Sequence, residues 1–91
     1  MQSMTIEQLR AASNAGGVSG VTLKGQGGAF LVQIDTLSGS GAVLAKARST
    51  EPRRFGNPLA ALNVLRYSGI TVGQFDASEY DPAEKELDAG N

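Results

Sequence analysis

The stretch RSTEPRRFGNP, residues 48–58, carries the side chains best suited to binding chemistry. It contains three arginines, which are Arg48, Arg53 and Arg54. A guanidinium group can hold a carboxylate or a phosphate through two parallel hydrogen bonds. The arginines stand just before a helix start expected at Asn57, where free N–H groups and the helix dipole favour an anion. Phe55, which we expect to be exposed, would add an aromatic anchor of the kind that dominates small interfaces.

The same stretch also fits an ordinary solvated connection. In that interpretation Glu51 neutralises one arginine, Phe55 packs under the edge of a sheet and the other arginines face water. Lys24 and Lys46 are expected on the outward face of a sheet, together with the first of the arginines, which favours an anion site. Asp35 in the centre of that face favours cross-strand ion pairing instead. The candidate residues for binding a partner or DNA are Arg48, Arg53, Arg54, Phe55, Lys24 and Lys46.

Cysteine and histidine are both absent from the sequence. Their absence excludes a disulfide framework, a zinc finger, a thiol nucleophile and acid–base catalysis by histidine. The segments GVSG and GQGG lack the Lys-Ser/Thr pair of a phosphate-binding loop, and we interpret them as turns. The carboxylates near the C-terminus lack the spacing of a calcium-binding loop. We therefore expect no enzymatic activity, no cofactor, no metal site and no small-molecule substrate.

The 91 residues carry a formal net charge of −1, but the charge is unevenly distributed. Through Ile70 there are seven basic and three acidic residues, a net charge of +4; from Thr71 there are one basic and six acidic residues, a net charge of −5. Such a split often accompanies nucleic-acid binding, although +4 is well below the charge of a dedicated nucleic-acid binder. The N-terminus lacks the pattern of a signal peptide, and no apolar run could span a bilayer. We therefore expect a cytoplasmic protein without membrane contact.

Local signals predict two helices. Thr5, with Gln8 three residues later, forms a capping box, and apolar residues at helical spacing predict a first helix over residues 6–14. Asn57 is the expected N-cap of the second helix, with Pro58 at its first position, where the missing N–H costs nothing. Glycine is expected to end this helix at position 69. The expected apolar face of the second helix consists of Leu59, Leu62 and Leu65, with Ala61 and Val64 beside them.

Alternating apolar and polar residues predict strands between the two helices. These strands are expected in GVTLKG, AFLVQID and AVLAKAR, at residues 20–25, 29–35 and 42–48. In the third of them, Val43, Ala45 and Ala47 are expected to point toward the core. A further short strand is expected after the second helix, in ITVGQF at residues 70–75.

The element order α-β-β-β-α-β predicts a single α+β domain. Because the loops between the strands are short, we expect an antiparallel meander with both helices on one of its faces. The compact domain is expected over residues 1–76. Residues 77–91 are polar and acidic, and we expect them to form a disordered or weakly helical tail.

The segments GVTLKGQGGAFLVQIDT and AVLAKARSTEPRRFGNPLAALNVLRYSGITVGQFDASEYDPA resemble the small partition-associated ParC proteins of plasmids and integrative elements of proteobacteria. The most distinctive parts are STEPRRFGNP and LRYSGITVGQFDAS, and the similarity would cover residues 6–82. The resemblance implies an accessory protein of plasmid or mobile-element partition and maintenance, in a system that joins a DNA-bound complex to a motor ATPase. It implies no catalytic residues, and the binding candidates named above are this chain's own.

Two functions fit these observations. In the first, the chain is a protein-interaction module that binds another maintenance protein, or a second copy of itself, through the arginine-rich loop and the free face of the sheet. In the second, the arginines with Lys24 and Lys46 bind DNA phosphates directly, with little reading of bases. We favour the interaction module, because aromatic residues are few and the net positive charge is low.

Overall fold

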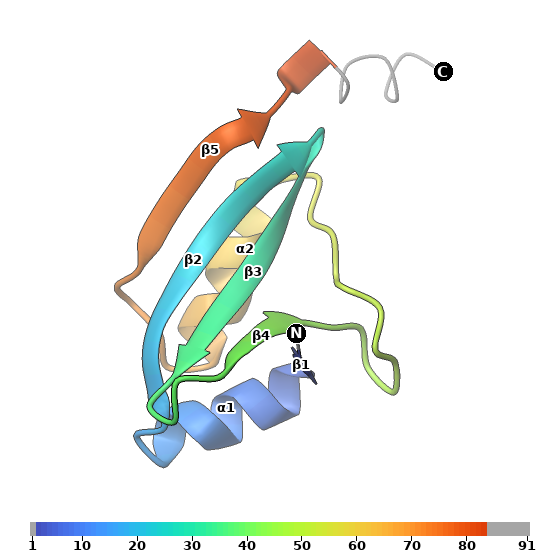
Figure 1. The fold of residues 1–91 in the computed structure, drawn as a ribbon. Coiled ribbons are helices and arrows are strands. Elements are labelled where there is room, and N and C mark those ends of the chain that lie inside the picture. Colours follow the sequence, from blue (N-terminus) through green and yellow to red (C-terminus); the bar gives the residue numbers. More distant parts are fainter. Residues whose placement is uncertain (1, 84–91) are drawn as a thin grey trace.

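The computed structural model describes residues 2–83 of the chain. Within that range, two helices and five strands follow one another (Figure 1). In chain order they are β1 (Gln2–Met4), α1 (Ile6–Asn14), β2 (Val18–Gly27), β3 (Ala29–Thr36), β4 (Gly41–Leu44), α2 (Pro58–Tyr67) and β5 (Gln74–Tyr80). The α+β class predicted from the sequence is confirmed. Neither of these helices is long and apolar enough to cross a membrane.

Both helices begin at the predicted caps. At α1 the Gln8 N–H donates to the Thr5 hydroxyl, and the Thr5 N–H donates to the Gln8 side chain in return, at 3.3 and 2.9 Å. At α2 the Leu59 N–H donates to the Asn57 side-chain oxygen at 2.9 Å, with proline at the first helical position. Gly69 follows the end of α2 with a φ of +89°, a conformation that glycine adopts without strain.

The five strands form one mixed sheet in the order β1-β4-β3-β2-β5. The predicted antiparallel meander holds for β2, β3 and β4. The two edge strands depart from it, because β1 pairs parallel with β4 and β5 pairs parallel with β2. The predicted order α-β-β-β-α-β is therefore wrong in lacking β1, and the sheet is not purely antiparallel.

Two helical crossovers explain the parallel edges. The pairings give β1, β2, β4 and β5 one direction and leave β3 alone in the other. Helix α1 therefore joins two parallel strands, β1 and β2, and α2 lies in the connection between two others, β4 and β5. Crossovers of this kind are nearly always right-handed, and two that step the same way across a sheet put their helices on one face. Leu9 of α1 and Leu65 of α2 do join a single core cluster.

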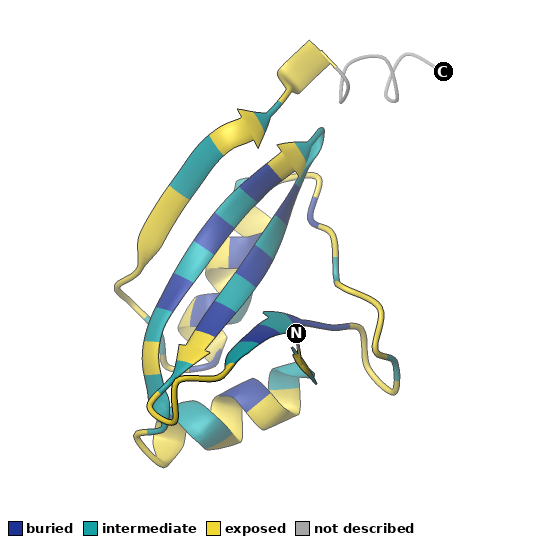
Figure 2. Ribbon diagram, viewed as in Figure 1, coloured by how far each residue is buried: buried dark blue, intermediate teal, exposed yellow. Residues whose placement is uncertain are grey.

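The core lies between this face of the sheet and the helices. Along β2 and β3, buried residues alternate with partly exposed ones, as Figure 2 shows. The buried apolar side chains are Leu9, Val21, Leu23, Phe30, Val32, Ile34, Ala42, Leu44, Ala45, Phe55, Ala61 and Leu65. All of them except Ala45 belong to one cluster, which is modest, as expected for a chain of this length.

The third predicted strand is shorter than expected, and its side chains point to the faces of the sheet opposite to those predicted. β4 ends at Leu44, and Ala42 and Leu44 are buried where Val43 was expected to be. The cause is the register with β3, which sets Ala42 opposite the buried Ile34, and residues opposite one another share a face. Of the other residues expected to face the core, Ala45 is buried and Ala47 is exposed. Because β4 ends at Leu44, Lys46 and Arg48 lie in the loop after this strand and not on an outward face of the sheet.

The last strand starts and ends later than predicted. β5 runs to Tyr80, so the predicted domain boundary after residue 76 is wrong and the first part of the predicted tail belongs to the sheet. The Tyr80 ring stacks on Phe30 with 4.7 Å between ring centroids, which ties the strand to the core. Residues 82 and 83 form the start of a helical turn, and the last part of the predicted tail, residues 84–91, lies outside the described residues.

β5 contains one extra residue relative to β2. Lys24 pairs with Asp76 and Gln26 pairs with Glu79, so two steps along β2 match three along β5. The Asp76 carboxylate supports this bulge, because it accepts hydrogen bonds from the Ser78 N–H at 3.0 Å and the Ser78 hydroxyl at 2.7 Å. These two bonds favour the charged carboxylate and lower the pKa of Asp76.

Candidate functional site

The arginine-rich loop between β4 and α2 is held along the sheet by backbone hydrogen bonds. The Arg53 N–H donates to the Leu44 carbonyl at 2.8 Å. Phe55 and Phe30 exchange two hydrogen bonds, at 2.7 and 2.8 Å, so this part of the loop continues the ladder beside β3. The loop therefore has a defined path over the protein surface, visible at the right of Figure 1.

The expected exposure of Phe55 is wrong, since only 4% of the residue is accessible to solvent. Its pairing with Phe30 turns the ring into the core cluster. The Arg53 guanidinium carbon lies 4.9 Å from the centre of the Phe55 ring and covers it from outside. Phe55 is therefore a core residue that supports the arginine and is not itself a contact for a partner.

The two candidate lysines are held in separate ion pairs. The Lys24 ammonium lies 3.5 Å from a carboxylate oxygen of Glu79, and the Lys46 ammonium lies 3.5 Å from one of Glu51. The expected basic face is not formed, because Lys24 is on β2 and Lys46 is in the loop. The solvated interpretation assumed that Glu51 neutralises an arginine. Glu51 instead pairs with Lys46.

Arg48 and Arg53 are brought together in one hollow of about 810 Å³. Its walls are the first turn of α1, including Glu7, the loop, and the second half of α2, including Tyr67. We call it the Arg-lined hollow. The arginines thus face α1 and the far part of α2, and not the start of α2 at Asn57, where the sequence had predicted an anion site. Arg54 is exposed but does not line this hollow.

A third guanidinium group reaches the same place. Arg10 of α1 donates a hydrogen bond of 2.9 Å to the Tyr67 hydroxyl, and its guanidinium carbon lies 4.7 Å from the ring centre. Tyr67 is exposed. Between residues 2 and 83, both ion pairs within 4.0 Å involve lysines, so no described carboxylate neutralises Arg10, Arg48 or Arg53.

Arg48 has an unusual backbone conformation. Its φ is +58°, and it is the one non-glycine residue with a positive φ in the part of the chain that the structure describes. A non-glycine residue in this left-handed region costs on the order of 1 kcal/mol relative to glycine. Arg48 is the third residue of a tight turn that the Ser49 N–H closes by donating to the Lys46 carbonyl at 3.1 Å, and some turn types require a positive φ at this position.

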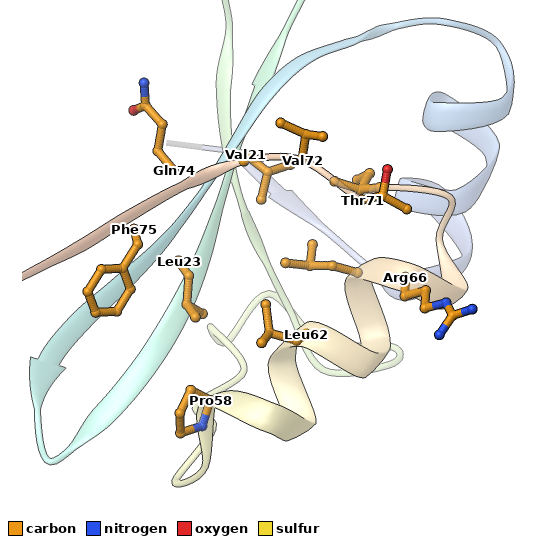
Figure 3. Close-up of a pocket in the computed structure, with 12 residues that line it drawn as sticks. Val21, Leu23, Pro58, Leu62, Arg66, Thr71, Val72, Gln74 and Phe75 are labelled. Carbon is orange, nitrogen blue, oxygen red and sulfur yellow. The ribbon is translucent and has the colours of Figure 1, made fainter.

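A second, apolar surface lies between α2 and β5 (Figure 3). Its floor is formed by Val21 and Leu23 of β2, and its walls include Leu62 of α2 and Phe75 of β5, in a groove of about 540 Å³. Phe75 is 68% exposed and Leu62 is 52% exposed. We call this surface the α2–β5 groove. It exists because α2 covers the central strands and leaves the inner side of the edge strand bare.

The sequence did not indicate several of these residues. Arg10 and Tyr67 are far apart in the chain, and no local pattern reveals that they meet. For the groove there was a signal, because the predicted apolar face of α2 is wider than a sheet can cover. The structure buries Ala61 and Leu65 and leaves Leu62 exposed, together with the neighbouring Leu59.

Comparisons of the chain with protein-family models, with curated proteins and with solved structures found no match. The fold is a small α+β domain with a five-stranded mixed sheet. Among its surface hollows, the Arg-lined hollow combines Arg48 and Arg53 with mainly apolar walls, and the α2–β5 groove is mainly apolar, with Arg66 as its one charged residue.

Proposed function

We propose that this chain is a non-enzymatic interaction module that binds an acidic segment of a partner protein in the Arg-lined hollow. The observation that carries the proposal is that Arg48 and Arg53 line one hollow with the exposed Tyr67, whose ring is also contacted by Arg10. Its setting is the cytoplasm, as an accessory protein of plasmid or mobile-element maintenance. That setting rests on the resemblance of the STEPRRFGNP and LRYSGITVGQFDAS segments to ParC proteins.

The chemistry of the hollow favours carboxylates. Guanidinium groups hold carboxylates through paired hydrogen bonds, and arginine and tyrosine supply a large share of the energy in many protein interfaces. Two guanidinium groups, those of Arg48 and Arg53, line the hollow with the single carboxylate of Glu7, and Arg10 adds a third positive charge through its contact with Tyr67. Glu7 repels an acidic ligand from the α1 side, so the ligand is expected to lie against the loop and Tyr67.

The strained backbone of Arg48 allows a clean test. Arg48→Gly removes a guanidinium group while relieving the positive φ, so the variant is expected to be at least as stable as the wild type. Arg54→Ala is the matched control, because it removes one exposed arginine of the same loop from outside the hollow. The probe is a fluorescein-labelled glutamate decapeptide, and the readout is fluorescence anisotropy at low and moderate salt.

We expect Arg48→Gly to weaken peptide binding about tenfold or more, since a hydrogen bond to a charged group contributes about 1.5–3 kcal/mol. Arg54→Ala should change the affinity less than about twofold, a typical effect at an exposed charge. Equal losses in both variants would mean that net charge alone attracts the peptide, and the proposal would then be wrong. An unchanged affinity in Arg48→Gly would contradict it as well.

Direct binding to DNA phosphates is the second candidate. It is favoured by Arg48 and Arg53 in the hollow and by Arg10 on Tyr67, whose exposed ring could stack on a base. Salt-sensitive binding of mixed-sequence duplex DNA, lost in Arg48→Gly, would support it. Ending the chain at Ala83 removes three acidic residues and one basic residue and should strengthen binding to DNA. Folded wild type that does not bind DNA even at low salt would exclude this candidate.

A further inference from the structure

Part of the Arg-lined hollow is apolar. Ile6 of α1 and Val64 of α2 line it, and both are half-buried side chains that pack against the core. Ala47 of the loop adds an exposed methyl group to the same hollow. The volume of about 810 Å³ lies in the range of about 300–1,000 Å³ that is typical of ligand pockets. A carboxylate bound to the arginines would by itself leave this apolar surface in water.

The two arginines of the hollow lie beside this apolar surface. Arg48 is exposed, and Arg53 is half-buried, with its guanidinium carbon 4.9 Å from the centre of the Phe55 ring. A guanidinium group that stacks on an aromatic ring keeps the N–H groups at its edge for a carboxylate. Apolar contact and positive charge are therefore offered to a ligand in the same hollow.

We infer that the acidic segment of the partner carries one apolar side chain of about the size of leucine among its carboxylates, and that this side chain binds against Ile6 and Val64. This identity of the segment rests on the proposed function. Charge complementarity with the two arginines selects an acidic segment, and the apolar surface then selects, among acidic segments, one with such an anchor. An apolar anchor surrounded by polar contacts is a common source of affinity in protein interfaces. A segment of glutamates alone would satisfy only the arginines.

The α2–β5 groove is less suited to this anchor. Of the twelve residues that line the groove, Arg66 alone is charged, and Figure 3 shows its side chain pointing away at the end of the helix. An apolar side chain bound in the groove would leave the neighbouring carboxylates of an acidic segment with few cations to pair with. The Arg-lined hollow provides both kinds of contact, so the anchor is assigned to it.

Fluorescence anisotropy of the full chain with three fluorescein-labelled decapeptides tests the anchor. The first is the glutamate decapeptide, and the other two carry leucine or serine in place of its fifth glutamate. The leucine peptide should bind about fivefold or more tightly than the serine peptide, because burying a large part of a leucine side chain contributes at least this much affinity. It should also bind more tightly than the glutamate decapeptide, although it carries one negative charge fewer. Attraction by net charge alone predicts the opposite order for these two peptides.

Two variants of α2 locate the anchor. Val64→Thr replaces a methyl group of the apolar surface by a hydroxyl group, and should lower the preference for leucine over serine to about twofold or less. Leu62→Ser is the matched control, because Leu62 lies on the same helix but lines the α2–β5 groove, and this variant should keep the preference. The preference is a ratio of two affinities of one variant, so a smaller fraction of folded protein does not change it.

A leucine peptide that binds no more tightly than the serine peptide would overturn the apolar anchor. The proposed function would then stand without it if Arg48→Gly still weakens binding of the glutamate decapeptide. Loss of the leucine preference in Leu62→Ser but not in Val64→Thr would place the anchor in the α2–β5 groove and overturn its assignment to the Arg-lined hollow. Absence of binding by all three peptides would overturn both the anchor and the proposed function.

Discussion

Gly25 allows the end of β5 to pack closely against β2, because it has no side chain. It pairs with Phe30 across β2 and β3, and the ring of Tyr80 from β5 stacks on Phe30 at the same place. A Cβ atom at Gly25 would lie 2.5 Å from the Tyr80 Cβ and 3.3 Å from its Cα, which are atoms that cannot move without moving the strand. The missing side chain of Gly25 is thus the space into which Tyr80 packs.

We predict that Gly25→Ala lowers the free energy of unfolding by about 1–3 kcal/mol, because it forces an extra methyl group into a packed contact. Urea denaturation followed by circular dichroism measures the change. Gly41→Ala is the control, since a Cβ there meets no atom within 4 Å, and its stability should differ from the wild type by less than about 1 kcal/mol. Equal stability of the two variants would mean that Tyr80 does not pack against Gly25.

The two helices and the strand β5 differ in how far the sequence determines them. Capping residues act within four positions of one another, so Thr5 and Asn57 placed the helix starts correctly. The edge strands depend on pairings between distant segments, β1 with β4 and β5 with β2, that no local pattern reveals. The end of β5 is a case in point, because Ala77–Tyr80 is polar in sequence and becomes a strand only through β2 and Phe30.

Ending the chain at different points measures the contribution of this strand. We predict that a chain ending at Asp76 is less stable than one ending at Ala83 by at least about 2 kcal/mol, because it loses the stacked Tyr80 and half of β5. Thermal denaturation of the two truncated chains makes the comparison. Equal melting temperatures would mean that residues 77–83 add no stability, as the predicted domain boundary after residue 76 implies.

At the scale of the whole molecule, one core joins both helices to the sheet. Leu9 of α1, Phe55 of the loop and Leu65 of α2 all belong to it. This shared core also explains why the candidate site was only partly predictable. The basic loop indicated Arg48 and Arg53, but the burial of Phe55 and the meeting of Arg10 with Tyr67 follow from how the elements pack. Long-range packing of this kind leaves no periodic signal in the sequence.

We predict that the domain unfolds as a unit. Leu9 is completely buried, so Leu9→Ala should lower stability by about 2–5 kcal/mol. Because the core is shared, far-ultraviolet circular dichroism and tyrosine fluorescence should show the same shifted transition. Tyr67 and Tyr80, the two tyrosines of the chain, lie in different elements and report on different parts of the fold.

Ala11→Gly, at an exposed position of α1, is the control for a local effect on helix propensity, expected to cost about 1 kcal/mol. A circular dichroism transition that separates from the fluorescence transition in Leu9→Ala would show that α1 unfolds independently of the sheet.

The extra residue in β5 bears on how relatives of this chain can be recognised. Phe75 and Tyr80 are five positions apart, a spacing that in a regular strand would put them on opposite faces. The bulge brings both rings to the helix side, where Phe75 lines the groove and Tyr80 meets Phe30. A relative without the bulge would keep two inward rings only with a spacing of four. Alignments of such chains should therefore allow a one-residue gap inside this strand, where gaps are normally penalised most heavily.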